Sequence, residues 1–303
     1  MDKEIIISGI SRSYDEVEAL RDISLEVDRG ALFGFIGPDG AGKTTLFRIL
    51  VTLLLPDKGR AWVSGFDVVK QYRKIRRITG YMPGRFSLYQ DLTVEENLKF
   101  FASIFRVRVD ENYDMIRDIY RQIEPFKDRP AGKLSGGMKQ KLALSCALVH
   151  RPEVLFLDEP TTGVDAVSRK EFWEMLGRLK EKGITVLVST PYMDEAGLCD
   201  RVALVQKGRL LDINTPRGII SGYPHPLAGV TSGNMRSLAN DLRTDPDVGS
   251  AFRFGDNIHC AGSGTELDID GLKERLEAKG HKNIAIERIE PGIEDCFMAL
   301  MKE

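Results

Sequence analysis

A glycine-rich segment carries the clearest chemical signal in this 303-residue sequence. Residues 37–44 read Gly-Pro-Asp-Gly-Ala-Gly-Lys-Thr, which satisfies the pattern GxxxxGK[ST] and directly follows an apolar run. Glycines let backbone N–H groups turn toward phosphate oxygens, and the start of the next helix adds a positive dipole end. We therefore expect Lys43 to reach the β- and γ-phosphates of a nucleotide and the Thr44 hydroxyl to bind Mg²⁺. The residues predicted to hold the nucleotide are Gly37, Pro38, Asp39, Gly40, Ala41, Gly42, Lys43, Thr44 and Thr45.

Two acids follow a second apolar run, Val154–Leu157. Asp158, at the expected carboxyl end of a strand, is predicted to hold Mg²⁺ through water, together with Thr44. Glu159 is predicted to be the catalytic residue, because a carboxylate there can polarise the water that attacks a phosphate. An apolar run ending in acids also fits an ordinary strand end, so this interpretation depends on the phosphate loop upstream.

A second glycine pair precedes another helix. Residues 134–140 read Leu-Ser-Gly-Gly-Met-Lys-Gln, and Ser135 is a suitable N-cap. A capped helix is the simplest interpretation, but Gly136 and Gly137 at a helix start also form an anion-binding site. Because the chain offers two such sites for one nucleotide, we expect this second site to serve a nucleotide bound to another subunit.

These motifs, in this order, resemble those of the ATP-binding subunits of ABC transporters, over about residues 3–215. Residues 37–44 match the family's Walker A motif, 134–140 its signature, 154–159 its Walker B motif and 160–165 its D-loop. The resemblance implies ATP and Mg²⁺ as cofactors and adds Asp165 to the nucleotide site. It also places Tyr14 where the family has an aromatic residue that stacks on adenine, although an isolated tyrosine equally fits surface or core packing.

The length and a small C-terminal domain are similar to subunits of ABC-2-type exporters, including drug-efflux systems. This implies a subunit that binds MgATP at a subunit interface and couples its hydrolysis to transport. The implied partners are an ABC-2-like membrane permease and a second ATP-binding subunit, in a homodimer or a heterodimer. The implied location is cytoplasmic, on the inner face of the cell membrane through the permease. The predicted apolar anchors for the permease, within Arg85–Asn97, are Phe86, Leu88, Tyr89 and Leu92.

Two positions depart from the family pattern. Gly84 stands where the family has a glutamine that touches Mg²⁺ and the attacking water, and Pro191 stands where it has a histidine that contacts the γ-phosphate. Neither residue offers a polar side chain, and proline also lacks a backbone N–H. Since phosphoryl transfer depends on positioning and charge stabilisation, ATP binding should survive while hydrolysis slows. A neighbouring Arg85, Gln90 or Tyr192 could supply the missing contacts.

Three functions therefore compete. The first is an ATPase that drives an exporter after closing with a second subunit around two ATP molecules. The second is a regulatory nucleotide-binding subunit that hydrolyses weakly and is paired with a more active ATPase. The third is an ABC protein acting on ribosomes or DNA; the single ATP module and the formal charge of −2 speak against this and against a nucleic-acid partner.

The motifs require strands and helices that hold them in place, and the pattern predicts an α/β fold: an ABC-type P-loop NTPase with an antiparallel β layer and a helical subdomain. Apolar runs at Ala31–Ile36, Val154–Leu157 and Ile184–Val188 predict parallel strands buried on both faces. Residues Glu4–Ser8 and Asp22–Val27 alternate in polarity, which predicts an antiparallel pair.

Helix signals lie between these runs. Thr93 and Glu96 form a capping-box pair at the start of a helix that carries Leu98, Phe101 and Ile104. A second helix has apolar residues at i, i+3, i+4 and i+7 and is expected to end at Gly183. Its apolar residues are Phe172, Met175, Leu176 and Leu179.

A cluster of glycine and proline between Pro216 and Pro226 indicates a domain boundary. We expect an ABC ATP-binding domain over 1–220, with its helical subdomain at about 84–150, and an accessory α+β domain over 226–303. The accessory domain reads as βαββαβ followed by a last helix from Ile293, the ferredoxin-like order. Its predicted elements are Leu227–Thr231, Asn234–Arg243, Gly249–Phe254, Asn257–Ala261, Asp270–Lys279 and Asn283–Ile289.

Composition supports a folded, soluble chain: 42% of residues are hydrophobic and 29% are charged. No apolar stretch approaches the ~20 residues that span a bilayer, and the polar N-terminus lacks the core of a signal peptide. The cysteines are widely spaced and are expected to be reduced packing residues, and the histidines lack metal-ligand spacing. These residues are Cys146, Cys199, Cys260, Cys296, His150, His225, His259 and His281.

Overall fold

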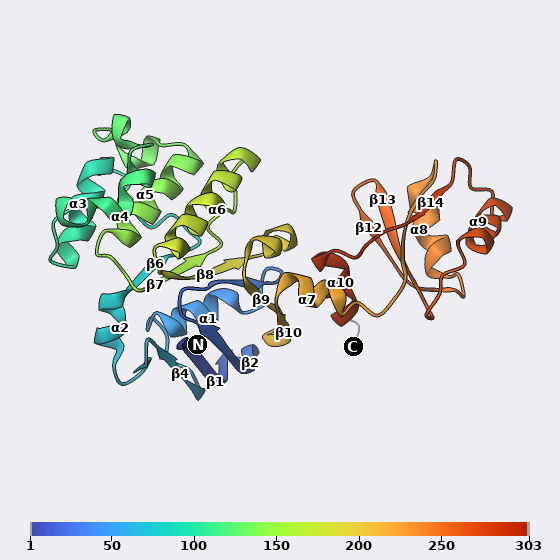
Figure 1. Cartoon of the computed structure of the whole chain (residues 1–303), viewed down its shortest axis with the longest axis horizontal. Helices are drawn as coiled ribbons and strands as arrows, with labels where there is room; N and C mark the ends of the chain where they lie inside the picture. Colours follow the sequence, from blue (N-terminus) through green and yellow to red (C-terminus); the bar gives the residue numbers. More distant parts are fainter. Residues whose placement is uncertain (1, 302–303) are drawn as a thin grey trace. The chain divides into compact units, whose positions relative to one another are not determined.

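A computed structural model of the chain describes residues 2–301, which fold as two compact units (Figure 1). The units divide between Pro216 and Arg217, within the first turn of helix α7 (Pro216–Ser221). This division falls at the start of the glycine- and proline-rich segment of the sequence. The phosphate loop and the acids of the second apolar run lie in the first unit.

The first unit is built on a mostly parallel sheet in the order β10-β9-β3-β8-β7-β6. Every residue of β3, β7 and β8 is buried, because helices or a second sheet cover both faces. The predicted parallel strands are thereby confirmed, and only the edge strand β10 runs antiparallel. The strands are β3 (Leu32–Ile36), β6 (Thr79–Met82), β7 (Val154–Asp158), β8 (Thr185–Thr190), β9 (Arg201–Gln206) and β10 (Arg209–Asn214).

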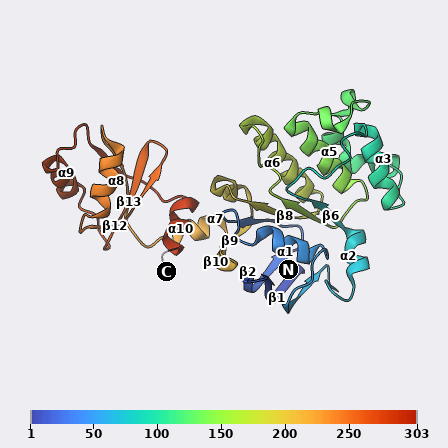
Figure 2. The ribbon, with the colours of Figure 1, turned by 180° about the vertical axis from the view of Figure 1, so that it is seen from behind.

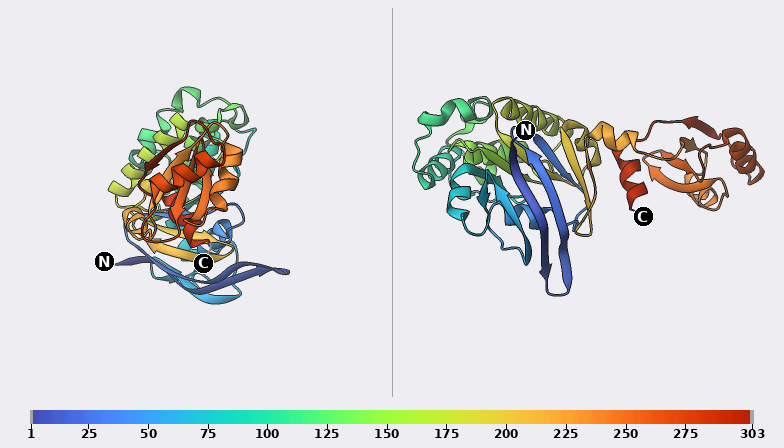
Figure 3. Two further views of the ribbon diagram at one scale, coloured as in Figure 1. Left: turned by 90° about the vertical axis from the view of Figure 1, so that its right-hand side faces the viewer. Right: turned by 60° about the horizontal axis from the view of Figure 1, so that its bottom comes forward.

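An antiparallel sheet in the order β2-β1-β4-β5 forms a second layer. The predicted antiparallel pair is confirmed, and its two strands continue beyond the predicted ranges into a long hairpin that turns between Tyr14 and Val17 (Figure 3, right). The strands of this layer are β1 (Lys3–Tyr14), β2 (Val17–Asp28), β4 (Lys58–Val63) and β5 (Phe66–Asp67).

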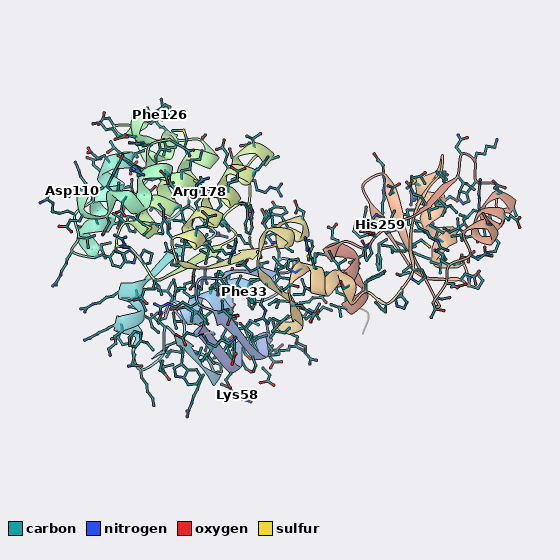
Figure 4. All side chains as sticks on the ribbon, in the orientation of Figure 1. Phe33, Lys58, Asp110, Phe126, Arg178 and His259 are labelled. Atoms are coloured by element: carbon teal, nitrogen blue, oxygen red, sulfur yellow. The ribbon has the colours of Figure 1, made fainter. Side chains whose placement is uncertain are left out.

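Helix α1 (Lys43–Leu50), which follows the phosphate loop, lies between the two sheets (Figures 1 and 2). Its residues Leu46, Phe47, Ile49 and Leu50 are fully buried in a core shared by both sheets. The Phe47 ring meets Phe35 of β3 and Phe156 of β7, with ring centroids 6.2 and 5.7 Å apart. Phe33, labelled in Figure 4, belongs to the same interior cluster. This packing fixes the start of α1 relative to the ends of β3 and β7.

The opposite face of the parallel sheet carries helices α5 and α6, and the segment between β6 and β7 forms a helical subdomain (Figure 2). The predicted capping box is confirmed: the Thr93 hydroxyl accepts from the Glu96 N–H at 3.2 Å and the Glu96 carboxylate accepts from the Thr93 N–H at 2.8 Å. Gly183 adopts φ +86° just after α6, as expected for a residue that ends a helix. The helices are α2 (Tyr72–Ile78), α3 (Val94–Ile104), α4 (Tyr113–Tyr120), α5 (Gly136–Leu148) and α6 (Ala166–Glu181).

The second unit has an antiparallel sheet in the order β12-β13-β11-β14. Leucines of α8 and α9 cover one face of the sheet and pack on Ala228, Val230 and Ile258. The order of strands and helices is the βαββαβ order read from the sequence, followed by α10. The elements are β11 (Leu227–Thr231), α8 (Met235–Arg243), β12 (Val248–Phe254), β13 (Asn257–Gly262), α9 (Ile269–Ala278), β14 (Ala285–Arg288) and α10 (Ile293–Leu300).

Within the described residues, all four cysteines are buried thiols, as predicted. Across residues 2–301, no helix combines the length and the apolar character that a membrane span requires.

Candidate functional site

The phosphate loop leaves β3 at Ile36 and turns into α1 at Lys43. Gly37 donates its N–H to the Thr190 carbonyl at 3.2 Å, and a Cβ at position 37 would lie only 2.1 Å from the Val205 carbonyl oxygen. Gly42 has φ +102°, and a Cβ there would lie 2.4 Å from the Ala19 carbonyl oxygen. Only glycine fits at position 37 or 42, because a side chain at either position would collide with a backbone carbonyl of a neighbouring strand.

Lys43 lies inside the curve of this loop, with only 3% of its surface exposed. Its ammonium group donates to the carbonyl oxygens of Gly37 at 2.8 Å and Pro38 at 3.0 Å, and it lies 3.2 Å from Oε1 of Glu159. The structure therefore brings together the predicted phosphate-binding lysine and the predicted catalytic carboxylate. An ammonium held there by neutral carbonyls and one acid can exchange those partners for phosphate oxygens.

Thr44 and Asp158 also meet, although they are 114 residues apart in the chain. The Thr44 hydroxyl donates to Oδ1 of Asp158 at 3.0 Å, and the hydroxyl of Ser189 donates to the same oxygen at 2.6 Å. These are oxygen ligands of the kind Mg²⁺ prefers, and the cation usually completes its shell with water and substrate phosphates. Among the described residues, no group of three or more His, Cys, Asp or Glu side chains is placed to hold a metal ion. The donor set thus fits a magnesium ion that arrives with the nucleotide.

Glu159 takes an unusual backbone conformation, with φ +50°. Its N–H donates to the carbonyl and to the hydroxyl of Ser189, both at 3.0 Å, which holds the residue in the left-handed region. A non-glycine residue persists in that region only when its surroundings fix it. Ser189 was not singled out from the sequence as a site residue. The available signal was a polar Ser-Thr pair after the apolar residues 186–188 of β8, next to a strand that carries two acids.

A buried carboxylate lies behind this site. Glu195 is 1% exposed, and it accepts from the Thr161 hydroxyl at 2.8 Å and from the Thr190 hydroxyl. The Thr190 hydroxyl in turn accepts from the Tyr192 N–H at 3.0 Å. This network joins the segment after Glu159 to the segment that carries Pro191. Sequence reasoning missed Glu195, because an acid in the short 3-10 turn Met193–Leu198 reads as a surface residue.

The two departures lie in the same region. A Cβ at Gly84 would lie 3.1 Å from the Asp158 carbonyl oxygen and 3.7 Å from Cβ of Glu159, so position 84 borders the paired acids. Of the possible substitutes, Tyr192 packs against Arg169, whose guanidinium carbon lies 4.7 Å from the centroid of the Tyr192 ring. Arg85 is solvent-exposed. No hydrogen bond within residues 2–301 brings the side chain of Arg85, Gln90 or Tyr192 to Glu159.

The signature segment lies apart from the phosphate loop of its own chain. The Ser135 hydroxyl accepts from the Met138 N–H at 3.4 Å and caps α5, as predicted, while Gly136 is exposed. A Cβ at Gly136 would lie 3.8 Å from the Gly163 carbonyl oxygen, which belongs to the segment 160–165. Nowhere in the described chain does a hydrogen bond or ion pair join 135–137 to 37–45.

The last two residues predicted to bind the nucleotide, Asp165 and Tyr14, contact other groups of the same chain. Asp165 caps α6, where Oδ1 accepts from the N–H groups of Val167 and Ser168 at 3.1 and 3.0 Å. The hydrogen bond from the Ser168 N–H lowers the pKa of Asp165, so the carboxyl is ionised at neutral pH. Tyr14 is 41% exposed at the hairpin turn, with the Arg12 guanidinium 5.3 Å from its ring centroid.

Comparison with known proteins identifies the family. A protein-family profile described as "ABC transporter" matches residues 20–162. The "Nod factor export ATP-binding protein I" of Rhizobium sp. (strain N33) is 32% identical over 98% of this chain and 96% of its own length. The chain belongs to the ABC transporter ATP-binding proteins. The family predicted from the motifs is thus confirmed, and with it the prediction of an ATP-binding cassette.

Two further comparisons define the extent of the match. The "Probable multidrug ABC transporter ATP-binding protein YbhF" of Escherichia coli (strain K12) is 37% identical over 99% of this chain, which spans 52% of that relative's length. A solved structure titled "Dimeric Structure of MJ0796, a Bacterial ABC Transporter Cassette" superimposes with a TM-score of 0.63 and 25% identity. It covers 70% of this chain and 98% of that structure, so the cassette matches and much of the remaining chain lies outside the match.

Proposed function

We propose that the chain is the ATP-binding subunit of a membrane exporter of the ABC-2 type, which binds MgATP at a subunit interface and hydrolyses it to drive transport. The observation that carries the proposal is the meeting of Lys43 with Glu159, and of Thr44 with Asp158, at the mouth of the phosphate loop. Relatives named for multidrug transport and for Nod factor export support an exporter.

Each residue of the site has a proposed part in hydrolysis. The N–H groups at the start of α1 and the Lys43 ammonium would bind the phosphates, which requires Lys43 to leave Glu159. Glu159, freed from that ion pair, would then accept a proton from the attacking water. Thr44 and Asp158 would hold Mg²⁺, which when bound neutralises charge on the phosphates. Ser189 orients both Asp158 and the Glu159 backbone, so it is a positioning residue.

A second ATP-binding subunit would complete the site. The exposed Gly136 and the capped Ser135 form an anion site that their own phosphate loop does not use. A neighbouring cassette can bring its nucleotide to that site, and the dimeric cassette of known structure supports such an arrangement. Asp165 ends the segment 160–165, whose Gly163 carbonyl borders Gly136, and would face the partner.

An apolar groove would receive a segment of the membrane permease. The groove has a volume of about 340 Å³ and lies between the β6 end of the sheet and the helical subdomain. Leu53 and Ile104 on its rim are 59% and 56% exposed, which favours an apolar partner segment. Of the predicted anchors, Tyr89 is 51% exposed against Phe100, whereas Leu88 is 8% exposed and contributes mainly to the wall. The groove residues include Val51, Leu53, Met82, Leu88, Phe101 and Ile104.

A regulatory subunit with a weak site is the second candidate, and one observation favours it. Gly84 and Pro191 border the acids and the phosphate loop, yet no polar side chain of the described residues takes the place of the family's glutamine and histidine there. A partner with both residues intact would then perform most of the turnover. The second unit, with its βαββαβ order, is proposed to be a ferredoxin-like accessory domain, in keeping with the expected division into 1–220 and 226–303.

Binding and turnover should be measured separately to test this proposal. We expect the purified chain to bind MgATP, and Lys43→Ala to abolish binding because it removes the only cation that the phosphate loop holds within the described site. Co-expression with the permease should move the chain from the soluble fraction to membranes. Absence of MgATP binding by the wild-type chain would refute the proposal, while binding with slow turnover would favour the regulatory form.

A further inference from the structure

A second surface of the first unit is strongly basic. Residues 68–90 contain six lysines and arginines and no acid, although the whole chain has a formal charge of −2. Five of these cations lie on and just before α2, which is exposed on the side of the unit toward the helical subdomain (Figure 1). They are Lys70, Arg73, Lys74, Arg76 and Arg77, and we call them the α2 cations.

The α2 cations keep their charge available. Throughout residues 2–301, none of them lies within ion-pair distance of an acid, and the nearby Asp67 carboxylate instead accepts from the N–H groups of Val69 and Lys70 at 2.9 Å. Neutral partners orient several of them. Arg76 donates to the hydroxyl and carbonyl of Thr52, both at 2.8 Å, and the Lys74 ammonium lies 4.9 Å from the centroid of the Phe66 ring.

Apolar side chains surround these cations. Leu53 and Leu55 are 59% and 62% exposed on the loop that Arg76 binds through Thr52, and Val69 and Tyr72 are 46% and 37% exposed on the α2 side. Unpaired cations beside exposed leucine, valine and tyrosine are typical of segments that lie at the boundary of lipid headgroups and acyl chains. A partner with phosphate charges and an apolar layer therefore fits this patch better than a purely polar one.

The position of the patch agrees with a membrane. Leu53 and Arg76 also line the apolar groove proposed to receive the permease, so the α2 cations border the place where a membrane protein would dock. We propose that the α2 cations bind anionic phospholipid headgroups of the membrane that holds the permease. This inference rests on the proposed function for the orientation of the chain, and on the charges and exposure of α2 for the chemistry.

Vesicle sedimentation of the purified full-length chain tests the inference. The probes are vesicles of phosphatidylglycerol mixed with phosphatidylcholine, and vesicles of phosphatidylcholine alone, at low and high salt. Each basic residue near an anionic surface typically changes binding about fivefold. The triple variant Arg73→Gln, Lys74→Gln, Arg77→Gln should therefore bind the anionic vesicles about 10²-fold more weakly than the wild type. Binding should also fall with salt, because exposed charges are screened.

Two controls make the result specific. The variant Arg236→Gln, Lys273→Gln, Lys282→Gln removes the same charge from exposed cations of the second unit and should bind vesicles like the wild type. The variant Arg73→Lys, Arg77→Lys keeps the charge and should also retain binding. MgATP binding by all variants shows that they are folded, and it separates this inference from the proposed function.

Three outcomes would overturn the inference. The first is equal binding of the wild type to anionic and neutral vesicles, and the second is unchanged binding by the Arg73, Lys74, Arg77 triple variant. The third is tighter, equally patch-dependent binding to a single-stranded RNA oligonucleotide, which would make a nucleic acid the partner. Loss of MgATP binding with intact vesicle binding would instead remove the proposed function and leave the lipid surface in place.

Discussion

Introducing a histidine at position 191 should raise the ATPase rate of the isolated chain. The Thr190 carbonyl accepts a hydrogen bond from the N–H of Gly37 in the phosphate loop. Residue 191 directly follows Thr190, so its side chain begins close to that loop. The hydroxyl of Thr190 is held by Glu195, which fixes the backbone from which that side chain would extend. One electrostatic donor aimed at the reacting phosphate typically changes the rate by about 10²–10³-fold. We expect Pro191→His to raise the rate by about 10²-fold.

A glutamine at position 84 should help less, and the structure gives the reason. Its Cβ would lie 3.1 Å from the Asp158 carbonyl oxygen, so the end of β7 must shift by a few tenths of an ångström. Such overpacking typically costs about 1–3 kcal/mol, which offsets about 10–10²-fold of the gain from a new donor. We therefore expect Gly84→Gln to raise the rate by about tenfold or less. Gly84→Ala, which adds the Cβ without the amide, should lower the rate or leave it unchanged.

Steady-state phosphate release at saturating MgATP is the suitable assay for wild type, both single variants, the double variant and Gly84→Ala. Glu159→Gln should remove the residual activity, and every variant should still bind MgATP because the phosphate loop is intact. If the wild type alone already turns over as fast as the double variant, the loss of the glutamine and histidine does not limit hydrolysis. The reasoning from Gly84 and Pro191 would then be wrong.

Other parts of the chain give further predictions. Thr161→Val removes a donor from the buried Glu195 carboxylate and should lower the free energy of unfolding of the first unit by about 1–3 kcal/mol in urea titrations. Phe47→Ala should lower it by about 3–5 kcal/mol, because the buried ring packs α1 against Phe35 and Phe156 of the parallel sheet; an unchanged midpoint would contradict that packing. The hydrogen bond from His281 lowers the pKa of Asp241, at 2.9 Å, below its usual 3.8. A depressed folded pKa stabilises above the unfolded pKa and loses this contribution as pH falls through the folded value. His281→Gln should therefore destabilise the second unit at neutral pH, and the difference in thermal midpoint from wild type should shrink below about pH 4.

Local patterns predicted most of the elements correctly. The apolar runs of β3, β7 and β8 were recognisable because strands covered on both faces need no polar residue, and the capping box of α3 is a four-residue signal. The hairpin of β1 and β2 was predicted too short. Its outer half alternates less clearly, since the residues near Tyr14 and Val17 are exposed on a two-stranded ribbon.

The motif residues of the site could be predicted from the sequence, but the residues that position them could not. Lys43, Thr44, Asp158 and Glu159 stand in segments with their own spacing rules, so the sequence identified each of them. Ser189 and Glu195 act through contacts to residues 31 and 34 positions away, and no local spacing encodes such contacts. The need for glycine at position 37 could not be read from the local sequence either, because a side chain there would collide with the carbonyl of Val205, which lies on a strand far along the chain.

The burial of the four cysteines has a practical consequence for experiments on this protein. Burial raises the pKa of the Cys146 and Cys199 thiols well above their usual range, and that of Cys260 to about 12. Because the thiolate is the nucleophile, these side chains should react very slowly with maleimides while the chain is folded. A single cysteine placed at the exposed Gly136 or Lys74 would then carry almost all of an added fluorophore. The native cysteines therefore need not be replaced before labelling, and fluorescence can measure how closely a second cassette or a bilayer approaches the labelled position.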